Sequence, residues 1–91
     1  MLLVQWQPDA EHDLLEIVSY IAQRNPDAAQ RVKDAIEQAA SQVPHHPYLY
    51  RVGIAAGTRE MVVHPNYVVI YCLTLTAVQI INVIHSRQQY P

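Results

Sequence analysis

The sequence has little of what several large classes of protein depend on. It contains a single cysteine, Cys72, so no disulfide framework forms and a reducing compartment such as the cytoplasm is expected. Its two glycines are too few for a phosphate-cradling loop. No apolar run approaches the roughly 20 residues that span a bilayer, and residues 1–6 lack the basic region of a signal peptide. We therefore expect neither a secreted nor a membrane protein.

Positive charge is also scarce. Lys33 is the only lysine, Lys and Arg together number 6, and the formal net charge is −2. Strong binding to nucleic acid through phosphates usually needs a clustered basic surface, so the chain alone is not expected to bind DNA strongly. The adjacent His45 and His46 lack the further converging ligands that a metal site needs. Neither a metal nor another cofactor is therefore expected.

What the chain does contain is typical of one globular domain over residues 1–91, with 51% hydrophobic and 15% charged residues. A short strand over residues 2–6 and then two helices are predicted. Proline is favoured at the first helical position, which places the two helix starts at Pro8 and Pro26. Asn25 is a good N-cap for the second helix, whereas Gln7 is a poor one for the first. The short connection predicts an antiparallel helix hairpin.

The first helix has an apolar face that recurs every three to four residues. The residues expected on its buried face are Ala10, Leu14, Ile17, Val18 and Ile21. Asp13, Glu16 and Gln23 fall elsewhere and are expected to be exposed to water. The second helix should end with Val43 outside the helical region, because Pro44 disfavours a helical residue before it.

The last third of the chain is rich in Val, Ile and Tyr, which favour strands. The expected strands are residues 58–64, 67–73 and 78–91, with turns at Pro65-Asn66 and at residues 74–77, and residues 51–54 add a short strand. Runs this close together pair most simply as antiparallel hairpins. Segregated helices and strands predict an α+β fold, with the helix hairpin packed on one face of a mainly antiparallel sheet.

The middle strand of this sheet is apolar on both faces. Its side chains should alternate, with Tyr67, Val69 and Tyr71 pointing one way and Val68, Ile70 and Cys72 the other. Because the helices can cover only one face, a partner is expected on the other.

Arg59 and Glu60 are adjacent in a predicted strand, so their side chains should point to opposite faces of the sheet. They cannot pair with each other directly. A purely structural role stays open for both, since either could hold the sheet to a helix residue such as Asp13 or Glu16.

Several stretches, in this order and at these spacings, carry a specific resemblance. They are Trp6-Gln7-Pro8-Asp9-Ala10-Glu11-His12-Asp13-Leu14 followed by residues 17–21, Asn25-Pro26-Asp27-Ala28-Ala29, Gly57-Thr58-Arg59-Glu60, His64-Pro65-Asn66-Tyr67 and Val83-Ile84-His85-Ser86-Arg87-Gln88-Gln89-Tyr90-Pro91. In them the chain resembles the RelE/ParE-type toxins of type II toxin–antitoxin systems, and the ParE branch most closely. The resemblance implies a β-α-α-β-β-β fold, neutralised by a ParD-like antitoxin whose flexible C-terminal segment folds along the toxin.

Resemblance to the ParE branch also implies a target. ParE-type toxins are associated with poisoning of DNA gyrase, so we expect inhibition by protein–protein contact, growth arrest and a role in plasmid maintenance, without enzymatic activity. The target-binding residues are expected to be Arg59, His85, Arg87, Gln88 and Tyr90. The antitoxin-binding residues are expected to be Tyr67, Val69, Tyr71, Ile81 and Val83.

RelE-type relatives instead cut messenger RNA on the ribosome, which keeps an enzymatic alternative open. Catalysis of this kind needs an acid, a base and a cation for the phosphate. The residues that could supply them are Arg59, His85, Arg87 and Tyr90. The RelE pattern favours several Lys and Arg in the sheet region, where this chain has no lysine. The gyrase hypothesis is therefore favoured.

Overall fold

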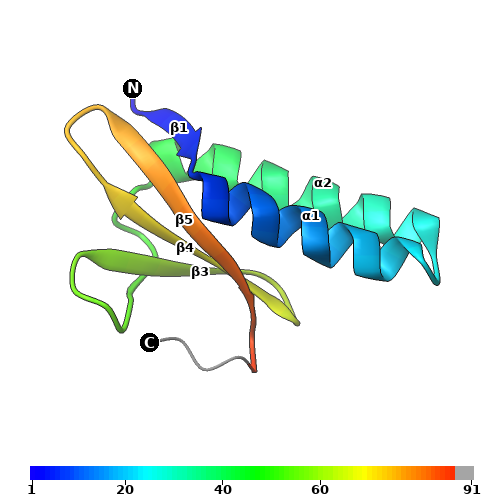
Figure 1. Ribbon diagram of the computed structural model, residues 1–91. Coiled ribbons are helices and arrows are strands. Elements are labelled where there is room, and N and C mark those ends of the chain that lie inside the picture. Colours follow the sequence, from blue (N-terminus) through cyan, green and yellow to red (C-terminus); the bar gives the residue numbers. More distant parts are fainter. Residues whose placement is uncertain (88–91) are drawn as a thin grey trace.

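The structure is a computed structural model that describes residues 1–87 (Figure 1). Its elements are β1 (Leu3–Trp6), α1 (Pro8–Ala22), α2 (Pro26–Gln42), the 3-10 turn η1 (Val43–His45), β2 (Arg51–Val52), β3 (Thr58–His64), β4 (Tyr67–Leu73) and β5 (Ala77–His85). This order confirms the predicted α+β fold, with the two-residue strand β2 added before the three long strands. No helix in the described range is long and apolar enough to cross a membrane.

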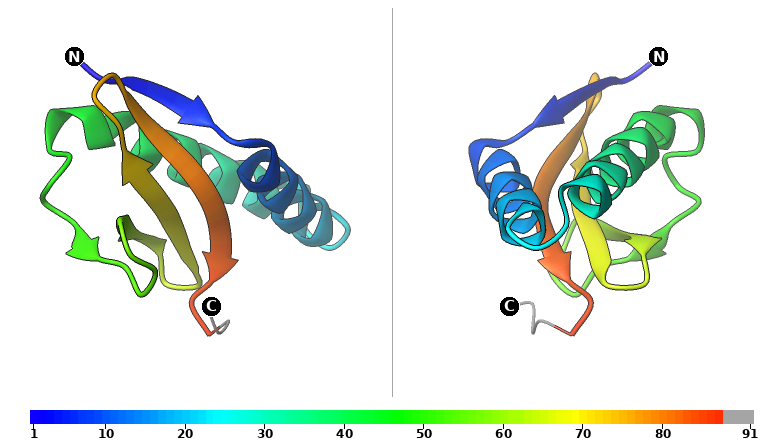
Figure 2. Two further views of the ribbon diagram at one scale, coloured as in Figure 1. Left: turned by 60° about the vertical axis from the view of Figure 1, so that its left-hand side comes forward. Right: turned by 90° about the vertical axis from the view of Figure 1, so that its right-hand side faces the viewer.

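The described strands form one five-stranded sheet in the order β1-β5-β4-β3-β2. The pairs formed by β2, β3, β4 and β5 are antiparallel, as predicted, whereas β1 runs parallel to β5. Both helices lie on the same face of this sheet (Figure 2). The N-terminal strand β1 therefore forms one edge of the sheet, next to the last strand, β5. The helix hairpin packs on one face of the sheet.

Proline and asparagine set the helix starts. Pro8 and Pro26 each occupy the first helical turn, as predicted. The Asn25 side-chain oxygen accepts a hydrogen bond from the Ala28 N–H at 3.0 Å, which satisfies one of the unpaired donors at the start of α2. Gln7 makes no capping hydrogen bond in the described part of the chain. The short connection between the two helices thus ends at Asn25, which caps the start of α2.

Replacing Asn25 with alanine is expected to lower the free energy of unfolding by about 1 kcal/mol, because the Ala28 N–H loses its acceptor. Urea denaturation followed by circular dichroism measures this change. Gln7→Ala is the matched control and should change stability by a few tenths of a kcal/mol, since that side chain caps nothing. Equal losses in the two variants would show that the cap does not stabilise α2.

The core lies between the helices and the sheet. Its fully buried members include Ala10, Ile36, Val43, Val69, Tyr71, Val78 and Ile80. Strand β4 contributes every second residue, because successive side chains of a strand point to opposite faces. In β5 this alternation shifts once, since a bulge at Ile81 separates the pairs Ile70–Asn82 and Tyr71–Ile80.

Two local expectations are corrected by the structure. Val43 keeps a helical backbone (φ −55°, ψ −40°) and begins η1, although Pro44 follows it. Burial of the whole Val43 side chain in the core outweighs the steric preference against a helical residue before proline. Asp13 is half-buried instead of exposed, because its Oδ2 accepts hydrogen bonds from Asn82 Nδ2 and the Val83 N–H, both at 3.0 Å.

Candidate functional site

The described residues expected to contact a target lie at two opposite ends of the sheet. Arg59, at the start of β3, is opposite Tyr71, whereas His85, at the end of β5, is opposite Tyr67. Because Tyr67 and Tyr71 are four residues apart on β4, Arg59 and His85 are separated by about 13 Å along the strands. Arg59 therefore does not lie beside His85, and the assignment of both residues to target binding stays a prediction. Gln88 and Tyr90 lie outside the described residues.

Arg59 is anchored to the loop before β2. Its Nη1 donates to the Tyr50 carbonyl at 2.7 Å and lies 3.4 Å from the Tyr48 carbonyl, and its guanidinium lies 5.1 Å from the centre of the Tyr48 ring. These contacts satisfy the cation within the chain. Arg59 therefore has a structural role, which fastens the loop to β3.

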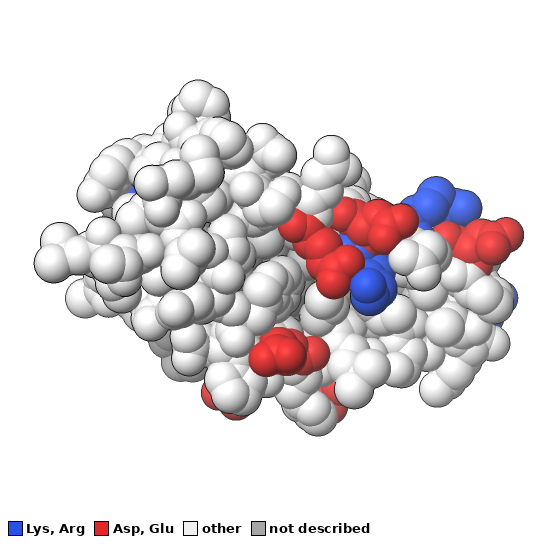
Figure 3. All heavy atoms as spheres, turned by 90° about the horizontal axis from the view of Figure 1, so that it is seen from above, with Lys and Arg blue, Asp and Glu red and all other residues white. Residues whose placement is uncertain are grey.

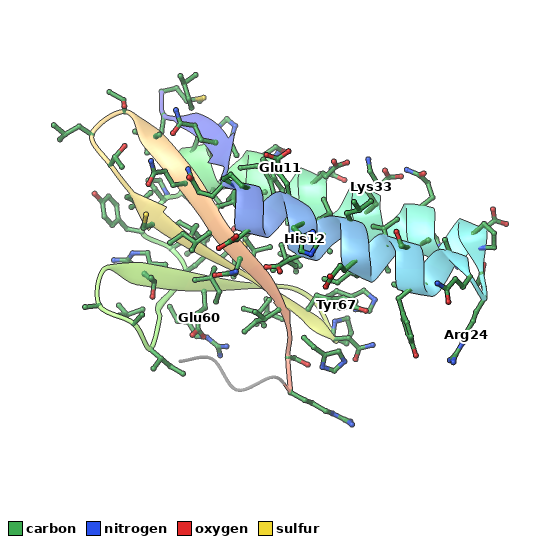
Figure 4. The ribbon with its side chains drawn as sticks, in the orientation of Figure 1. Glu11, His12, Arg24, Lys33, Glu60 and Tyr67 are labelled. Atoms are coloured by element: carbon green, nitrogen blue, oxygen red, sulfur yellow. The ribbon has the colours of Figure 1, made fainter. Side chains whose placement is uncertain are left out.

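Glu60 points to the other face, as adjacent strand residues must, and lies on the side of β3 away from the helices (Figure 4). Its Oε1 accepts from Arg51 Nε at 2.8 Å, across the β2–β3 pair. Both residues have the structural role that the sequence left open, but their partners among the described residues are Arg51 and the loop before β2 and not Asp13 or Glu16 of α1. Strand pairing brings Arg51 opposite Glu60, and the sequence did not show that register.

A row of three aromatic rings forms at the other end of the sheet. The Tyr67 ring lies 5.5 Å from the His64 ring and 5.7 Å from the His85 ring, measured between ring centres. His64 Nδ1 accepts from the Asn66 N–H, and His85 Nδ1 accepts from the Arg87 N–H, each at 3.1 Å. The sequence analysis named Tyr67 and His85 but missed His64. The two-residue turn Pro65-Asn66 was the available signal, since it places His64 opposite Tyr67.

Three of the expected antitoxin-binding residues face the helices and are buried by them. Val69 and Tyr71 are 0% exposed and Val83 is 3% exposed. They cannot present side chains to a partner, so their assignment to the antitoxin surface is corrected. Tyr67 and Ile81 are half-buried. The alternation along β4 was predicted, but the face that the helices cover was not.

Tyr71 is also a hydrogen-bonding member of the core. Its hydroxyl donates to the Pro47 carbonyl at 2.9 Å. Burial raises the pKa of Tyr71 above its ordinary value of 10.0, while the nearby Arg59 works in the opposite direction. The hydroxyl therefore keeps its proton at neutral pH and remains a donor that holds the loop after η1.

The sheet face without helices is less open than expected. Val68 and Ile70 point toward it and yet are 4% and 0% exposed. Apolar side chains that do remain accessible include Val62 on β3, at 59%, and Leu3 on β1, at 65%. This face therefore does not offer the continuous apolar strip that β4 alone would have provided.

The described part of the chain has an accessible apolar groove in a different place, between α1, α2 and the end of β1. We call it the helix groove; it encloses about 520 Å³ and is lined by Trp6, Glu11, Leu14, Leu15, Val18, Lys33 and Glu37. Leu15 is 63% exposed there and lies beside the apolar floor that Leu14 and Val18 form. The sequence analysis did not assign Leu15 to any surface, although it follows Leu14 and falls outside the buried stripe.

Charged side chains form the rim of the helix groove. Glu11 of α1 and Lys33 of α2 lie on the same outer side of the hairpin (Figure 4). Lys33 Nζ pairs with Glu37 Oε1 at 3.0 Å. Figure 3 shows the acidic and basic side chains gathered over the helical part of this face, with almost none over the rest. An apolar floor with a charged rim suits an amphipathic segment of another protein.

Among the described residues, neither the helix groove nor the row of rings brings together a set of metal ligands. Within residues 1–87, no three His, Cys, Asp or Glu side chains are placed to hold a metal ion. The element order, the mixed sheet and the hairpin on one face instead define the class of RelE/ParE-like toxins.

Comparison with known proteins agrees with this class. The sequence model of the ParE toxin of type II toxin–antitoxin systems, parDE, matches residues 4–90. The protein Y4kP of Sinorhizobium fredii is 35% identical over 89 residues, which is 97% of this chain and 92% of that relative. Toxin RelE2 of Caulobacter vibrioides is 36% identical over 88 residues, which is 97% of this chain and 99% of that toxin.

A solved structure supports the fold. The chromosomal ParDE toxin–antitoxin system of P. aeruginosa contains a chain that superposes with a TM-score of 0.83, covering 93% of this chain and 96% of that one at 15% identity. The chain therefore belongs to the ParE toxin family of type II toxin–antitoxin systems. As a member of that family it is the toxin component, and its partner is an antitoxin.

Proposed function

We propose that this toxin inhibits DNA gyrase by protein–protein contact, catalyses no reaction itself, and is neutralised by a ParD-like antitoxin. The family match and the resemblance to the ParE branch support this target. The observation that carries the proposal is the separation of Arg59 from His85. Two of the four candidate nuclease residues therefore do not gather around one phosphate, since they lie at opposite ends of the strands and Arg59 is bound to the Tyr48 and Tyr50 carbonyls.

The contact surface for gyrase is proposed at the end of β5. Arg87 is exposed there, two residues after His85, which belongs to the row of rings that includes Tyr67. Arginine and tyrosine are the side chains that most often anchor protein interfaces. A gyrase target also places the toxin in the cytoplasm and accounts for growth arrest and plasmid maintenance as consequences of blocked replication.

The antitoxin is proposed to dock in the helix groove. A flexible segment that folds on binding can fit an apolar floor such as Leu14, Leu15 and Val18 while its polar face meets the charged rim. Among the apolar residues that line the helix groove, Leu15 is the most exposed and has the most apolar surface still to bury. This location replaces the buried side chains of Val69 and Tyr71 as the expected antitoxin surface.

Purified toxin is expected to block DNA supercoiling by gyrase in a reaction that contains no ribosomes. Arg87→Ala should raise the concentration needed for half inhibition about tenfold or more, because truncation of an interface anchor costs about 2 kcal/mol of binding or more and each 1.4 kcal/mol is tenfold. Arg31→Ala is the matched control, since it removes the same charge from an exposed position on α2. Full supercoiling at excess wild-type toxin would rule out the gyrase target.

The name of the relative RelE2 favours one second candidate, a ribosome-dependent messenger RNA endonuclease. Primer extension on a translated message during toxin expression would then show new cuts, and His85→Ala would remove them. Intact message in growth-arrested cells would exclude this activity and leave the gyrase proposal in place.

A further inference from the structure

A second hollow lies on the other side of α1, between this helix and the sheet end where β4 begins and β5 ends. It encloses about 360 Å³, and its lining includes Asp13, Glu16, Tyr20, Tyr67 and His85. Figure 4 shows Tyr67 beneath α1 at this end of the sheet. We call it the acidic hollow, because two carboxylates and neither Lys nor Arg are among its described lining residues.

The Asp13 carboxylate of the acidic hollow is held in a fixed position. Asn82 Nδ2 and the Val83 N–H both donate to Asp13 Oδ2 at 3.0 Å. A carboxylate can accept about four hydrogen bonds, so Asp13 Oδ1 can take further donors from a ligand. Glu16 contributes a second carboxylate one helical turn away and pairs through Oε1 with His12 Nε2 at 2.8 Å. The hollow is therefore complementary to a cation with several N–H donors.

The walls of the acidic hollow are aromatic. The Tyr67 ring is fixed by the His64 and His85 rings that flank it at 5.5 and 5.7 Å. Tyr20 already has a guanidinium against its ring, since Arg24 Cζ lies 5.3 Å from the ring centre. A planar guanidinium stacks on such faces and donates in pairs to carboxylates, whereas an ammonium offers only a point charge. The hollow thus fits an arginine side chain better than a lysine.

We infer that the acidic hollow binds an arginine side chain of the antitoxin. The inference rests on the proposed docking of the antitoxin in the helix groove. Leu15 lines that groove and Glu16, the next residue, lines the acidic hollow, so the two sites are separated by the width of α1 alone. A helix with its side chains is about 10 Å across, so one segment that crosses α1 reaches both.

The first test uses a small probe on the isolated toxin. Titration with N-acetyl-arginine amide, followed by NMR, should shift the backbone amide signals of Asn82 and Val83. The uncharged citrulline derivative should bind at least tenfold more weakly, because it keeps the shape of arginine and loses the charge. Glu16→Gln should weaken arginine binding severalfold, whereas Asp34→Asn, an exposed charge change on α2, should leave it unchanged. Equal binding of the two derivatives would overturn the inference.

The second test uses a ParD-like antitoxin that binds the toxin, with calorimetric titration of the complex. Both Leu15→Asp and Glu16→Gln are expected to weaken binding about tenfold or more, and both residues are exposed enough to leave folding intact. Loss with Leu15→Asp alone would overturn the arginine site and leave groove docking standing. Loss with Glu16→Gln alone would overturn groove docking and support the acidic hollow. Arginine binding without any effect of Glu16→Gln on the antitoxin would overturn the assignment to that partner.

Discussion

Shortening Ile36 to alanine is expected to lower the free energy of unfolding by about 3 to 4 kcal/mol. Ile36 is 0% exposed and belongs to the core cluster between α2 and the sheet. Removal of buried methyl groups loses their transfer free energy and leaves a cavity that the surroundings fill only in part. A domain of this length has a total stability of roughly 5–13 kcal/mol, so the loss is a large share of it.

Urea denaturation followed by circular dichroism measures this loss, and the melting temperature should fall by roughly 15 °C or more. Leu15→Ala is the matched control, because it removes a side chain of similar size that is 63% exposed. Its effect on stability should stay within about 0.5 kcal/mol, while it weakens antitoxin binding. Similar destabilisation by both variants would mean that Leu15 belongs to the core and that the helix groove is not an open surface.

The elements whose signals are local could be predicted from the sequence. Pro8 and Pro26 mark both helix starts, and Asn25 caps the second, because caps and first turns depend on residues within three positions of one another. The alternation of β4 likewise follows from adjacent residues. These features gave the order of the elements and the fold class.

Contacts between distant parts of the chain could not be predicted. Asp13 was expected to be exposed because it falls outside the apolar face of its helix. Instead its carboxylate is half-buried against β5, where Asn82 and Val83, some 70 positions later, donate hydrogen bonds to it. Arg59 was expected to bind the target because arginine favours interfaces, yet the carbonyls of the loop before β2 accept its hydrogen bonds. In both cases a polar side chain has its partner on an element that sequence spacing does not place beside it.

The prediction placed the antitoxin-binding surface on the wrong face of β4 for a related reason. Both faces of β4 are apolar, so nothing within that strand says which face the helices cover. The helices cover the face of Val69 and Tyr71, and the accessible apolar surface moves to the outer side of the hairpin around Leu15. An amphipathic helix that keeps one leucine outside its buried stripe was the signal for this groove.

This arrangement places the two binding roles proposed for the toxin on adjoining surfaces. The helix groove and the acidic hollow lie on the two sides of α1, whereas the exposed Arg87 follows the end of β5. His85 lines the acidic hollow and also precedes the proposed gyrase contact. An antitoxin that fills the acidic hollow would therefore reach the edge of the gyrase surface, which offers a direct route to neutralisation.

Replacing Asp13 with alanine is expected to lower the free energy of unfolding by about 2 to 3 kcal/mol. The change removes the acceptor of two hydrogen bonds, from Asn82 Nδ2 and from the Val83 N–H, and both bonds are to a charged group. The Val83 N–H lies at a half-buried position behind α1, so water replaces the lost acceptor only in part. The loss thus comes chiefly from a donor left unsatisfied where the helix meets the bulged strand.

Two measurements separate this role of Asp13 from a general effect of removing charge. Urea denaturation should show the full loss for Asp13→Ala and a change of less than about 1 kcal/mol for Asp9→Ala, an exposed carboxylate in the first turn of the same helix. Asp13→Asn should fall between them, because its amide oxygen can still accept both hydrogen bonds but lacks the charge that strengthens them. Hydrogen exchange at the Val83 amide should accelerate in Asp13→Ala more than the loss of overall stability requires. An unchanged exchange rate there, or equal losses at Asp9 and Asp13, would show that α1 is held to β5 by apolar packing alone.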